Sequence, residues 1–412
     1  MTNGRRGLGR GASFGLLVVA NVLLMASTSA PSPIYPVYLQ RWGFSVTVLT
    51  VVFAVYVAGL VVALLTVGSL SDHIGRRPVL IASLLVAAAG TALFWAADGV
   101  GVLVIARIVQ GLATGMATGA LAAELVELSP ADRPHRGPMM TAVGTSFGLA
   151  AGGGITGLLV QAGPHPDAVV FPVLTVAFLV VAALVADIPE TADRSPGVLK
   201  SLRPSVHVPR ETRRAFLGAV PAIVASWSLT GLFLALTPSL VTDVLHEGFG
   251  AAGGLGIAVL FLANSAGGLW AARHTARVAT LMGAVLLVVG SAVLAGSLVA
   301  GSAVVFLLGS ILAGLGVGLT FTGTLRGISA ATTAKARSEV FSAAYVVSYA
   351  AMSLPSLAAG LVAPSWGLEA TGYSYLGFVG VLSVTAAVLA RRPRGADPAP
   401  AAELAAARPD HS

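Results

Sequence analysis

Apolar residues follow one another in long runs along almost the whole chain, and short polar segments separate these runs. A run of about 18 or more such residues, wound as an α-helix, crosses a hydrocarbon layer of about 30 Å. The pattern predicts twelve transmembrane helices, at roughly 12–38, 46–70, 78–97, 101–125, 139–162, 168–187, 215–242, 250–271, 278–299, 302–326, 339–362 and 371–390. We therefore expect an all-α membrane protein whose solvent and partner is the lipid bilayer.

The composition supports this interpretation. Of the 412 residues, 56% are hydrophobic and 10% are charged, and a water-soluble core cannot absorb so much apolar surface. Cysteine is absent, which excludes disulfides and thiolate metal sites, and the sequence implies no metal and no cofactor. The excess of arginine over lysine, with abundant alanine and glycine, is typical of a bacterial chain.

The basic residues are concentrated in every second polar segment. With the N-terminus inside, the cytoplasmic segments hold Arg5, Arg6, Arg10, Arg76, Arg77, Arg133, Arg136, Arg210, Arg213, Arg214, Arg273, Arg277 and Arg337, and the opposite segments hold only Arg41. This asymmetry is the positive-inside pattern, and it predicts cytoplasmic termini. The net charge of +7 does not indicate a nucleic-acid partner, because the basic residues share no solvated face.

Two parts of the sequence are related by an offset near 203–205 residues. Pro33 and Gly43 near the end of the first span recur as Pro238 and Gly248 near the end of the seventh, and a glycine pair of the fourth span recurs in the tenth. A cleavable signal peptide ending near Ala30 is the rival interpretation of the first span. Removing that span would break the repeat, so we count it as a membrane helix.

The repeat predicts four parts of the chain. They are an N-terminal six-helix bundle at 1–187, a cytoplasmic linker at 188–214, a C-terminal six-helix bundle at 215–391 and a disordered cytoplasmic tail at 392–412.

The segment between the second and third spans reads GSLSDHIGRRP and begins at Gly68. Gly68 lets two helices approach closely, and Gly75 permits a backbone turn that other residues resist. Arg76 and Arg77 hold the loop at the inner surface, and Asp72 supplies an acceptor for hydrogen bonds.

This segment resembles the signature of the major facilitator superfamily, G-x-x-x-D-x-x-G-R-R/K, with every position filled. The resemblance implies two pseudo-symmetric six-helix bundles, and within the family the chain resembles the bacterial 12-helix antiporters that exchange drugs or metabolites for protons. It also implies a conformational latch, in which Asp72 accepts hydrogen bonds near a helix N-terminus of the second half. The alternative is an inert loop with ordinary positive flanks. The copy between the eighth and ninth spans keeps Arg277 but has lost the aspartate, so the latch is expected to depend mainly on the first half.

Arg107 and Gln110 lie in the fourth span within the order R-I-V-Q-G, which is similar to the family's R-x-x-Q-G signature. Arg107 is predicted about 9 Å inside the outer boundary, where a charge is costly unless it faces a cavity, a partner or the headgroups. The resemblance implies a role in proton or substrate coupling. The alternative is that Arg107 snorkels to the outer interface. Gln110, three residues further on, shares its face.

Glycines at four-residue spacing form grooves in two spans. Gly111 and Gly115 in the fourth span, and Gly148 and Gly152 in the fifth, are typical of close helix packing. With Gly153, the fifth span is similar to the family's antiporter signature G-P-x-x-G-G, but a leucine replaces the proline. The kink that the proline would give is therefore in question, and so is the antiporter assignment.

Polar and aromatic side chains that could line a central cavity occur in both halves. They are Asn21, Tyr35, Tyr38, Tyr56, Trp227, Asn264, Tyr345 and Tyr349. Each is equally explained as an interfacial anchor or a packing residue, although Tyr345 and Tyr349 are one helical turn apart and face one way. Such a cavity suits amphipathic or weakly polar organic molecules.

The sequence places no carboxylate near the middle of a span, although many proton-coupled transporters use one to carry the proton. Glu124 and Glu339 lie near inner ends of spans, and Asp243 lies near an outer end. Under the repeat offset Glu124 falls beside the counterpart of Arg326, so these two are expected either to pair with Arg76 or Asp72 in an inner gate or to be ordinary boundary charges. Proton coupling therefore follows from the resemblance alone.

Together these features predict a monomeric secondary transporter of the bacterial plasma membrane that exports small organic molecules by proton antiport, its halves rocking about a central site. The alternatives are a proton-independent facilitator or importer of a polar small molecule, and a non-transporting sensor or scaffold. An enzyme is not expected, because the sequence has no P-loop and no catalytic set within the membrane.

Overall fold

The computed structural model describes residues 8–68, 70–130, 132–163, 165–192, 207–244, 251–333 and 336–391. Within these ranges, twelve helical segments are long and apolar enough to cross a membrane. Most of the predicted linker, the whole predicted tail and Gly248 of the repeat lie outside the described residues.

The helices of the first half begin with a span in three pieces. In chain order they are α1 (Arg10–Ser29), the 3-10 helix η1 (Ser32–Ile34), α2 (Tyr35–Trp42), α3 (Val46–Val67), α4 (Ser71–Ile74), α5 (Arg76–Trp95), α6 (Val100–Glu127), α7 (Arg136–Ala162) and α8 (Asp167–Val185).

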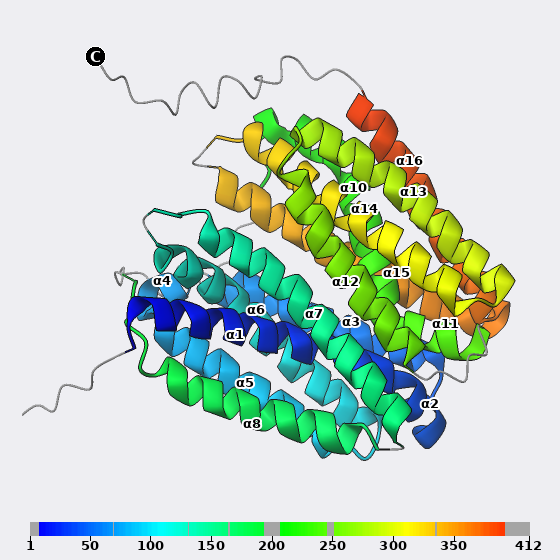
Figure 1. The fold of residues 1–412 in the computed structure, drawn as a ribbon, viewed down its shortest axis with the longest axis horizontal. Coiled ribbons are helices and arrows are strands. Elements are labelled where there is room, and N and C mark those ends of the chain that lie inside the picture. The colour runs from blue at the N-terminus through cyan, green and yellow to red at the C-terminus, as the bar shows by residue number, and fades with distance from the viewer. Residues whose placement is uncertain are drawn as a thin grey trace, which may run out of the picture.

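The helices of the second half repeat this order. They are α10 (Arg210–Ala235), α11 (Thr237–Val244), α12 (Ala252–Ala271), α13 (Ala276–Ala300), α14 (Ala303–Ala330), α15 (Arg337–Trp366) and α16 (Leu368–Arg391). The two groups form two six-helix bundles side by side (Figure 1), which confirms the predicted fold class.

Both halves break their first span at the same place. Pro33 lies in η1, between α1 and α2, and Pro238 lies in the first turn of α11, directly after α10 ends. Proline fixes φ and has no N–H to donate, so it is tolerated at the start of a new helical segment and interrupts a continuous one. The breaks give each half a helix end inside the protein.

Glycine grooves set the spacing of equivalent helix pairs. A Cβ atom at Gly111 or Gly115 of α6 would collide with backbone carbonyls of α3. At the counterparts Gly314 and Gly318 of α14, a Cβ atom would collide with backbone carbonyls of α12 in the same way. The close approach of these backbones requires glycine, since any side chain would separate the helices.

The outer surface of the bundle is apolar. Val173, Val299 and Val381 are examples of large apolar side chains that are mostly exposed on long helices. A water-soluble protein does not leave such surfaces uncovered over whole helices, whereas lipid solvates them.

We call the side of the molecule that carries Leu8 and Arg391 the termini face, and the other side the opposite face; in Figure 1 they lie toward α4 and toward α2 and α11, respectively. The halves meet where α3 packs against α15 and α7 against α12. Near the opposite face, Thr47 Oγ1 donates a hydrogen bond to Gly360 O at 2.6 Å. About midway along the helices, Asn264 Nδ2 donates to Ser146 Oγ at 3.3 Å. The halves are therefore joined on the side of the opposite face.

Candidate functional site

Arg107 is completely buried in α6 and faces the end of α1. Its Nε donates to Tyr35 Oη at 2.6 Å, and its Nη1 donates to Thr28 O at 3.2 Å and to Gln110 Oε1 at 2.7 Å. Gln110 Nε2 donates in turn to Ser27 O at 2.7 Å. The last carbonyls of a helix have no partner within it, and they carry partial negative charge. The break in the first span leaves carbonyls at the end of α1 without partners in the helix, and Arg107 and Gln110 donate hydrogen bonds to two of them.

Three aromatic rings surround the guanidinium. Arg107 Cζ lies 5.2 Å from the ring centre of Tyr35, 5.3 Å from that of Tyr56 and 5.5 Å from that of Phe94. Cation–π attraction at such distances stabilises a desolvated cation. Among the described residues, no carboxylate forms an ion pair with Arg107. The prediction that Arg107 snorkels to the interface is wrong, because the guanidinium is bound inside the first half.

The four candidate substrate residues of the first half are buried in this conformation. Tyr35 and Tyr56 belong to the shell of Arg107, and Tyr56 Oη also donates to Thr28 Oγ1 at 3.3 Å. Tyr38 stacks on Trp42 with ring centres 4.3 Å apart. Asn21 Nδ2 donates to the carbonyl of Thr141 on α7 at 3.0 Å, which ties α1 to α7. Contact of these four residues with substrate stays a prediction.

The three aromatic candidates of the second half form one cluster. The ring of Trp227 on α10 lies edge-on to Tyr349 of α15 at 5.0 Å and to Phe321 of α14 at 5.4 Å, and Tyr345 lies 6.4 Å from Tyr349. We call these four residues the aromatic wall. Phe321 is not among the predicted residues, because a single phenylalanine in an apolar span carries no signal of its own.

The aromatic wall is partly exposed. Tyr345 is 37% exposed, and Trp227 and Tyr349 are partly exposed. Tyr345 lies eight residues after the start of α15, about 12 Å from the termini face. The wall is therefore on the termini side of the contacts that join the halves.

Asn264 lies elsewhere, at the boundary between the halves. Its bond to Ser146 of α7 makes it a contact between α12 and α7. Its role with substrate stays a prediction.

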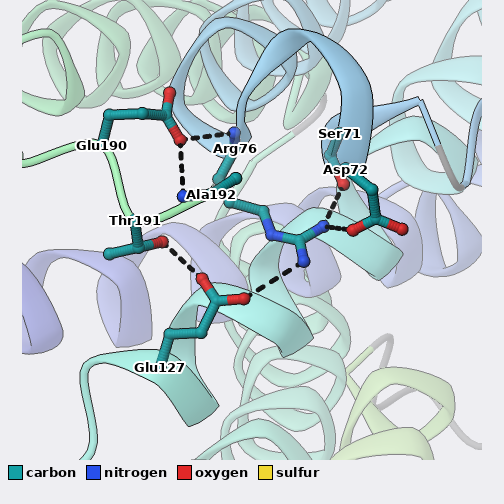
Figure 2. A network of polar contacts seen from close by, with 7 residues as sticks. All are labelled: Ser71, Asp72, Arg76, Glu127, Glu190, Thr191 and Ala192. Atoms are coloured by element: carbon teal, nitrogen blue, oxygen red, sulfur yellow. Dashed lines mark hydrogen bonds and ion pairs between the residues drawn. The ribbon is translucent and has the colours of Figure 1, made fainter. Parts of the chain in front are cut away.

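The loop between α3 and α5 is the centre of a polar network (Figure 2). The Arg76 side chain forms an ion pair with Asp72, donates to Ser71 Oγ at 2.6 Å and forms a second ion pair with Glu127 of α6 at 3.1 Å. Thr191 donates to the other carboxylate oxygen of Glu127. The network joins α4, α5, α6 and the segment after α8 within the first half. Contact of Asp72 with the second half, and hence the latch, stays a prediction.

Glu190 caps the beginning of α5. Its carboxylate accepts from the backbone N–H groups of Arg76 at 2.8 Å and of Arg77 at 3.3 Å, as Figure 2 shows for Arg76. Gly75 has φ of 109°, and a Cβ atom there would collide with this carboxylate. Gly75 thus serves two purposes, a left-handed turn and room for the cap. The remaining loop residues also have defined places: Gly68 lies against Gly119 of α6, and Arg77 Nη1 donates to carbonyls at the end of α8.

Glu124 has neither of its predicted environments. It does not pair with Arg76 or Asp72, because Glu127, one turn further along α6, occupies Arg76. It is also no ordinary boundary charge, because its side chain is 0% exposed and neither carboxylate oxygen has a hydrogen-bond partner among the described residues. Glu127 is not among the predicted site residues, although an acid three residues after Glu124 on the same helix was the available signal for it.

The glycines of α7 contact two different partners. A Cβ atom at Gly148 or Gly152 would collide with backbone carbonyls of α1, so these two glycines hold α1 and α7 together within the first half. A Cβ atom at Gly153 would collide with Ile257 of α12, in the second half. The predicted hinge at this place is therefore a contact between halves as well as within one.

The single basic residue of the opposite segments is neutralised. Arg41 forms an ion pair with Asp167 at 2.7 Å and contacts His165. The charge asymmetry between the two faces is therefore stronger than a count of basic residues suggests.

Twelve membrane spans in two related bundles, with a buried cation in one and an aromatic wall in the other, are the features of a membrane transporter. The family profile of the Major Facilitator Superfamily matches residues 17–295. The chain belongs to the major facilitator superfamily of transporters.

Similar proteins are found by sequence and by structure. The tetracycline resistance protein, class C, of Escherichia coli is 33% identical over 139 residues, which are 33% of this chain and 34% of that protein. The aligned part thus spans about a third of the length of that relative. Among solved structures, a D-xylose–proton symporter is 15% identical with a TM-score of 0.76, over 93% of this chain and 98% of that one. A bacterial homologue of the human lysosomal transporter Spinster, inward-facing and unoccupied, is 12% identical with a TM-score of 0.74, over 93% and 97%. At these identities the two structures show the fold alone.

Proposed function

We propose that this transporter exports small organic molecules from a bacterial cell by proton antiport, with both termini in the cytoplasm. The aromatic wall is the observation that carries the proposal. Four rings from α10, α14 and α15 lie together and are at least partly exposed, so they offer π faces and edges to a ligand. Sites lined by such rings bind flat or amphipathic organic molecules through apolar area, with few polar contacts.

The similarity to a tetracycline resistance protein supports a drug-like substrate and the direction of export. The position of the aromatic wall supports the direction of export as well. The wall lies on the termini side of the contacts that join the halves, so a substrate would enter from the cytoplasm in this conformation. Release requires the contacts of α3 with α15, and of α7 with α12, to open toward the opposite face.

Arg107 supports coupling to a second ion. It links α6 to the broken end of α1, so any tilt of α1 within the first half changes the environment of a buried cation. Such a change alters the interaction energy between Arg107 and protonatable groups in the same bundle, because charges interact strongly where water is excluded. We therefore keep Arg107 and Gln110 as coupling residues and Asp72, Gly75, Arg76 and Arg77 as the latch.

The test is transport into everted membrane vesicles, in which the cytoplasmic face points outward. Tetracycline and a panel of drugs and metabolites are offered with the proton gradient imposed or collapsed, and vesicles without the protein are the control. The proposal predicts accumulation of at least one panel compound that the uncoupler abolishes. Equal transport with and without the gradient would show a facilitator instead.

A further inference from the structure

Glu124 is a buried acid that the latch network leaves unused. It lies one turn before the end of α6, is 0% exposed, and has no hydrogen-bond partner among the described residues. Glu127, three residues later, has the opposite environment, because its carboxylate is partly exposed and bound by Arg76 and Thr191. Two acids on one helix end thus differ in whether a cation and donors reach them.

The immediate surroundings of Glu124 are apolar. Its neighbours along the helix, Ala120, Leu121, Leu125 and Leu128, belong to the core that α6 forms with α1, α5 and α8. An ionised carboxylate without partners is costly in such a place, and a neutral carboxylic acid is much less so.

The charged groups that act on Glu124 come from three elements. They are Arg76 and Arg77 of α5, Glu127 of α6 and Glu190 after α8. Both arginines already have partners: Arg76 binds acids and Ser71, and the Arg77 guanidinium binds backbone carbonyls. From α1, Arg10 donates to the backbone carbonyl of Glu127. In this conformation, therefore, each nearby cation is engaged elsewhere.

We propose that Glu124 is the residue that binds the exchanged proton. In the conformation seen here its carboxyl group holds the proton, and the O–H bond breaks when the latch network rearranges and Arg76 turns from Glu127 toward Glu124, one helical turn away. The proton passes to water at the termini face, and the ionised carboxylate takes over the ion pair. This inference names the proton site of the proposed antiport and rests on that proposed function.

The assignment links release of the proton to a change of conformation. The ion pairs of Arg76 hold the loop between α3 and α5, so exchanging one acid for another at Arg76 changes that loop whenever the proton leaves. An acid that stays protonated throughout the cycle would be a packing residue only, and the experiments below separate these cases.

The first test needs no substrate. Infrared spectra of the purified full-length protein are recorded between pH 5 and pH 10 for wild type, Glu124→Gln and the control Glu211→Gln, an exposed acid at the start of α10. We expect a carbonyl-stretch band of a protonated carboxylic acid at neutral pH in wild type and in the control, its loss at high pH, and its absence in Glu124→Gln. A wild-type spectrum without that band, or a band that does not change with pH, would overturn the inference.

The second test uses the panel compound that wild type moves best, in proteoliposomes. Glu124→Gln should lose accumulation driven by the proton gradient but retain exchange of labelled for unlabelled compound, while Glu211→Gln keeps both. Retention of gradient-driven accumulation by Glu124→Gln would overturn the proton site and leave antiport intact. Absence of any gradient effect in wild type would instead overturn the proposed antiport. Size-exclusion profiles and melting curves check folding. If Glu124→Gln does not fold, the presence and the pH dependence of the infrared band in wild type and in Glu211→Gln decide the case.

Discussion

The two halves of the molecule share a backbone plan and differ in what they bury. Where the first half has Arg107 in α6, the repeat places Ser310 in α14, and Ser310 Oγ donates only to the carbonyl of Phe306 in its own helix at 2.8 Å. Where the second half has Tyr345 and Tyr349, the repeat places Thr141 and Thr145 in the first half. The first half thus buries a cation where the second has a serine, and the second half has tyrosines where the first has threonines.

The same difference holds at the termini face. In the first half, Arg76 is held by the carboxylates of Asp72 and Glu127. In the second half, Arg326 donates to the carbonyls of Ala271 at 2.9 Å and His274 at 3.0 Å. Bonds to backbone carbonyls do not depend on protonation. The comparison teaches that a symmetric backbone can bury a cation in one half and present a cluster of aromatic rings in the other; under our proposals, the first half handles the proton and the second recognises the substrate.

The largest loss of stability is expected at Arg107, where the two halves differ most. Arg107→Ala removes the donor of Tyr35, Gln110 and a carbonyl of α1 at once, and each buried group left without a partner destabilises by about 1–3 kcal/mol. We expect a loss of about 3 kcal/mol in the free energy of unfolding in detergent, together with loss of transport. Ser310→Ala is the matched change in the second half and should lower stability by about 1 kcal/mol or less. Similar losses for both variants would remove the asymmetry.

The glycine grooves should respond equally in both halves. Gly111→Ala and Gly314→Ala each place a Cβ atom against a backbone carbonyl, and overpacking of this kind destabilises by about 1–3 kcal/mol. Gly377→Ala on α16 is the control, because no atom lies within 4 Å of its Cβ position. Melting curves of the three variants measure the effect, and a response from only one half would contradict the shared backbone plan.

Removing a ring from the aromatic wall should weaken substrate binding. Trp227→Ala removes the ring that contacts both Tyr349 and Phe321, and we expect about tenfold lower affinity, which is about 1.4 kcal/mol. Trp366→Ala, at the other end of α15 and 60% exposed, is the control and should leave affinity unchanged. Unchanged binding by Trp227→Ala would take the wall out of the substrate site.

The smallest change in affinity is expected in the latch. Asp72→Asn removes the charge that pairs with Arg76, so the loop should rearrange more slowly while the aromatic wall is unchanged. Transport rate at saturating substrate should fall, and affinity should stay within about twofold of wild type. A large loss of affinity would move Asp72 from the latch to the binding site.

Much of the fold was readable from the sequence because each feature that defines it is local. Apolar runs gave the spans, and the recurrence of Pro33 as Pro238 gave the repeat, whereas the break that separates α1 from α2 was not predicted. Glu127, Glu190 and Phe321 were not found, since their roles depend on which helix faces meet across distant parts of the chain. Glu124 was given the wrong partner for the same reason: two acids one turn apart look alike in sequence, and only packing decides which one reaches Arg76.

The division between the halves can be tested by measuring how substrate affinity depends on pH in wild type, Trp227→Ala and Glu124→Gln, with the best panel compound. If substrate binding releases a proton from Glu124, linkage requires the affinity of wild type to rise with pH through the titration of that group. The account predicts that Trp227→Ala has lower affinity at every pH with the same dependence on pH, and that the affinity of Glu124→Gln does not change with pH. A pH dependence that survives in Glu124→Gln, or that disappears in Trp227→Ala, would contradict the account.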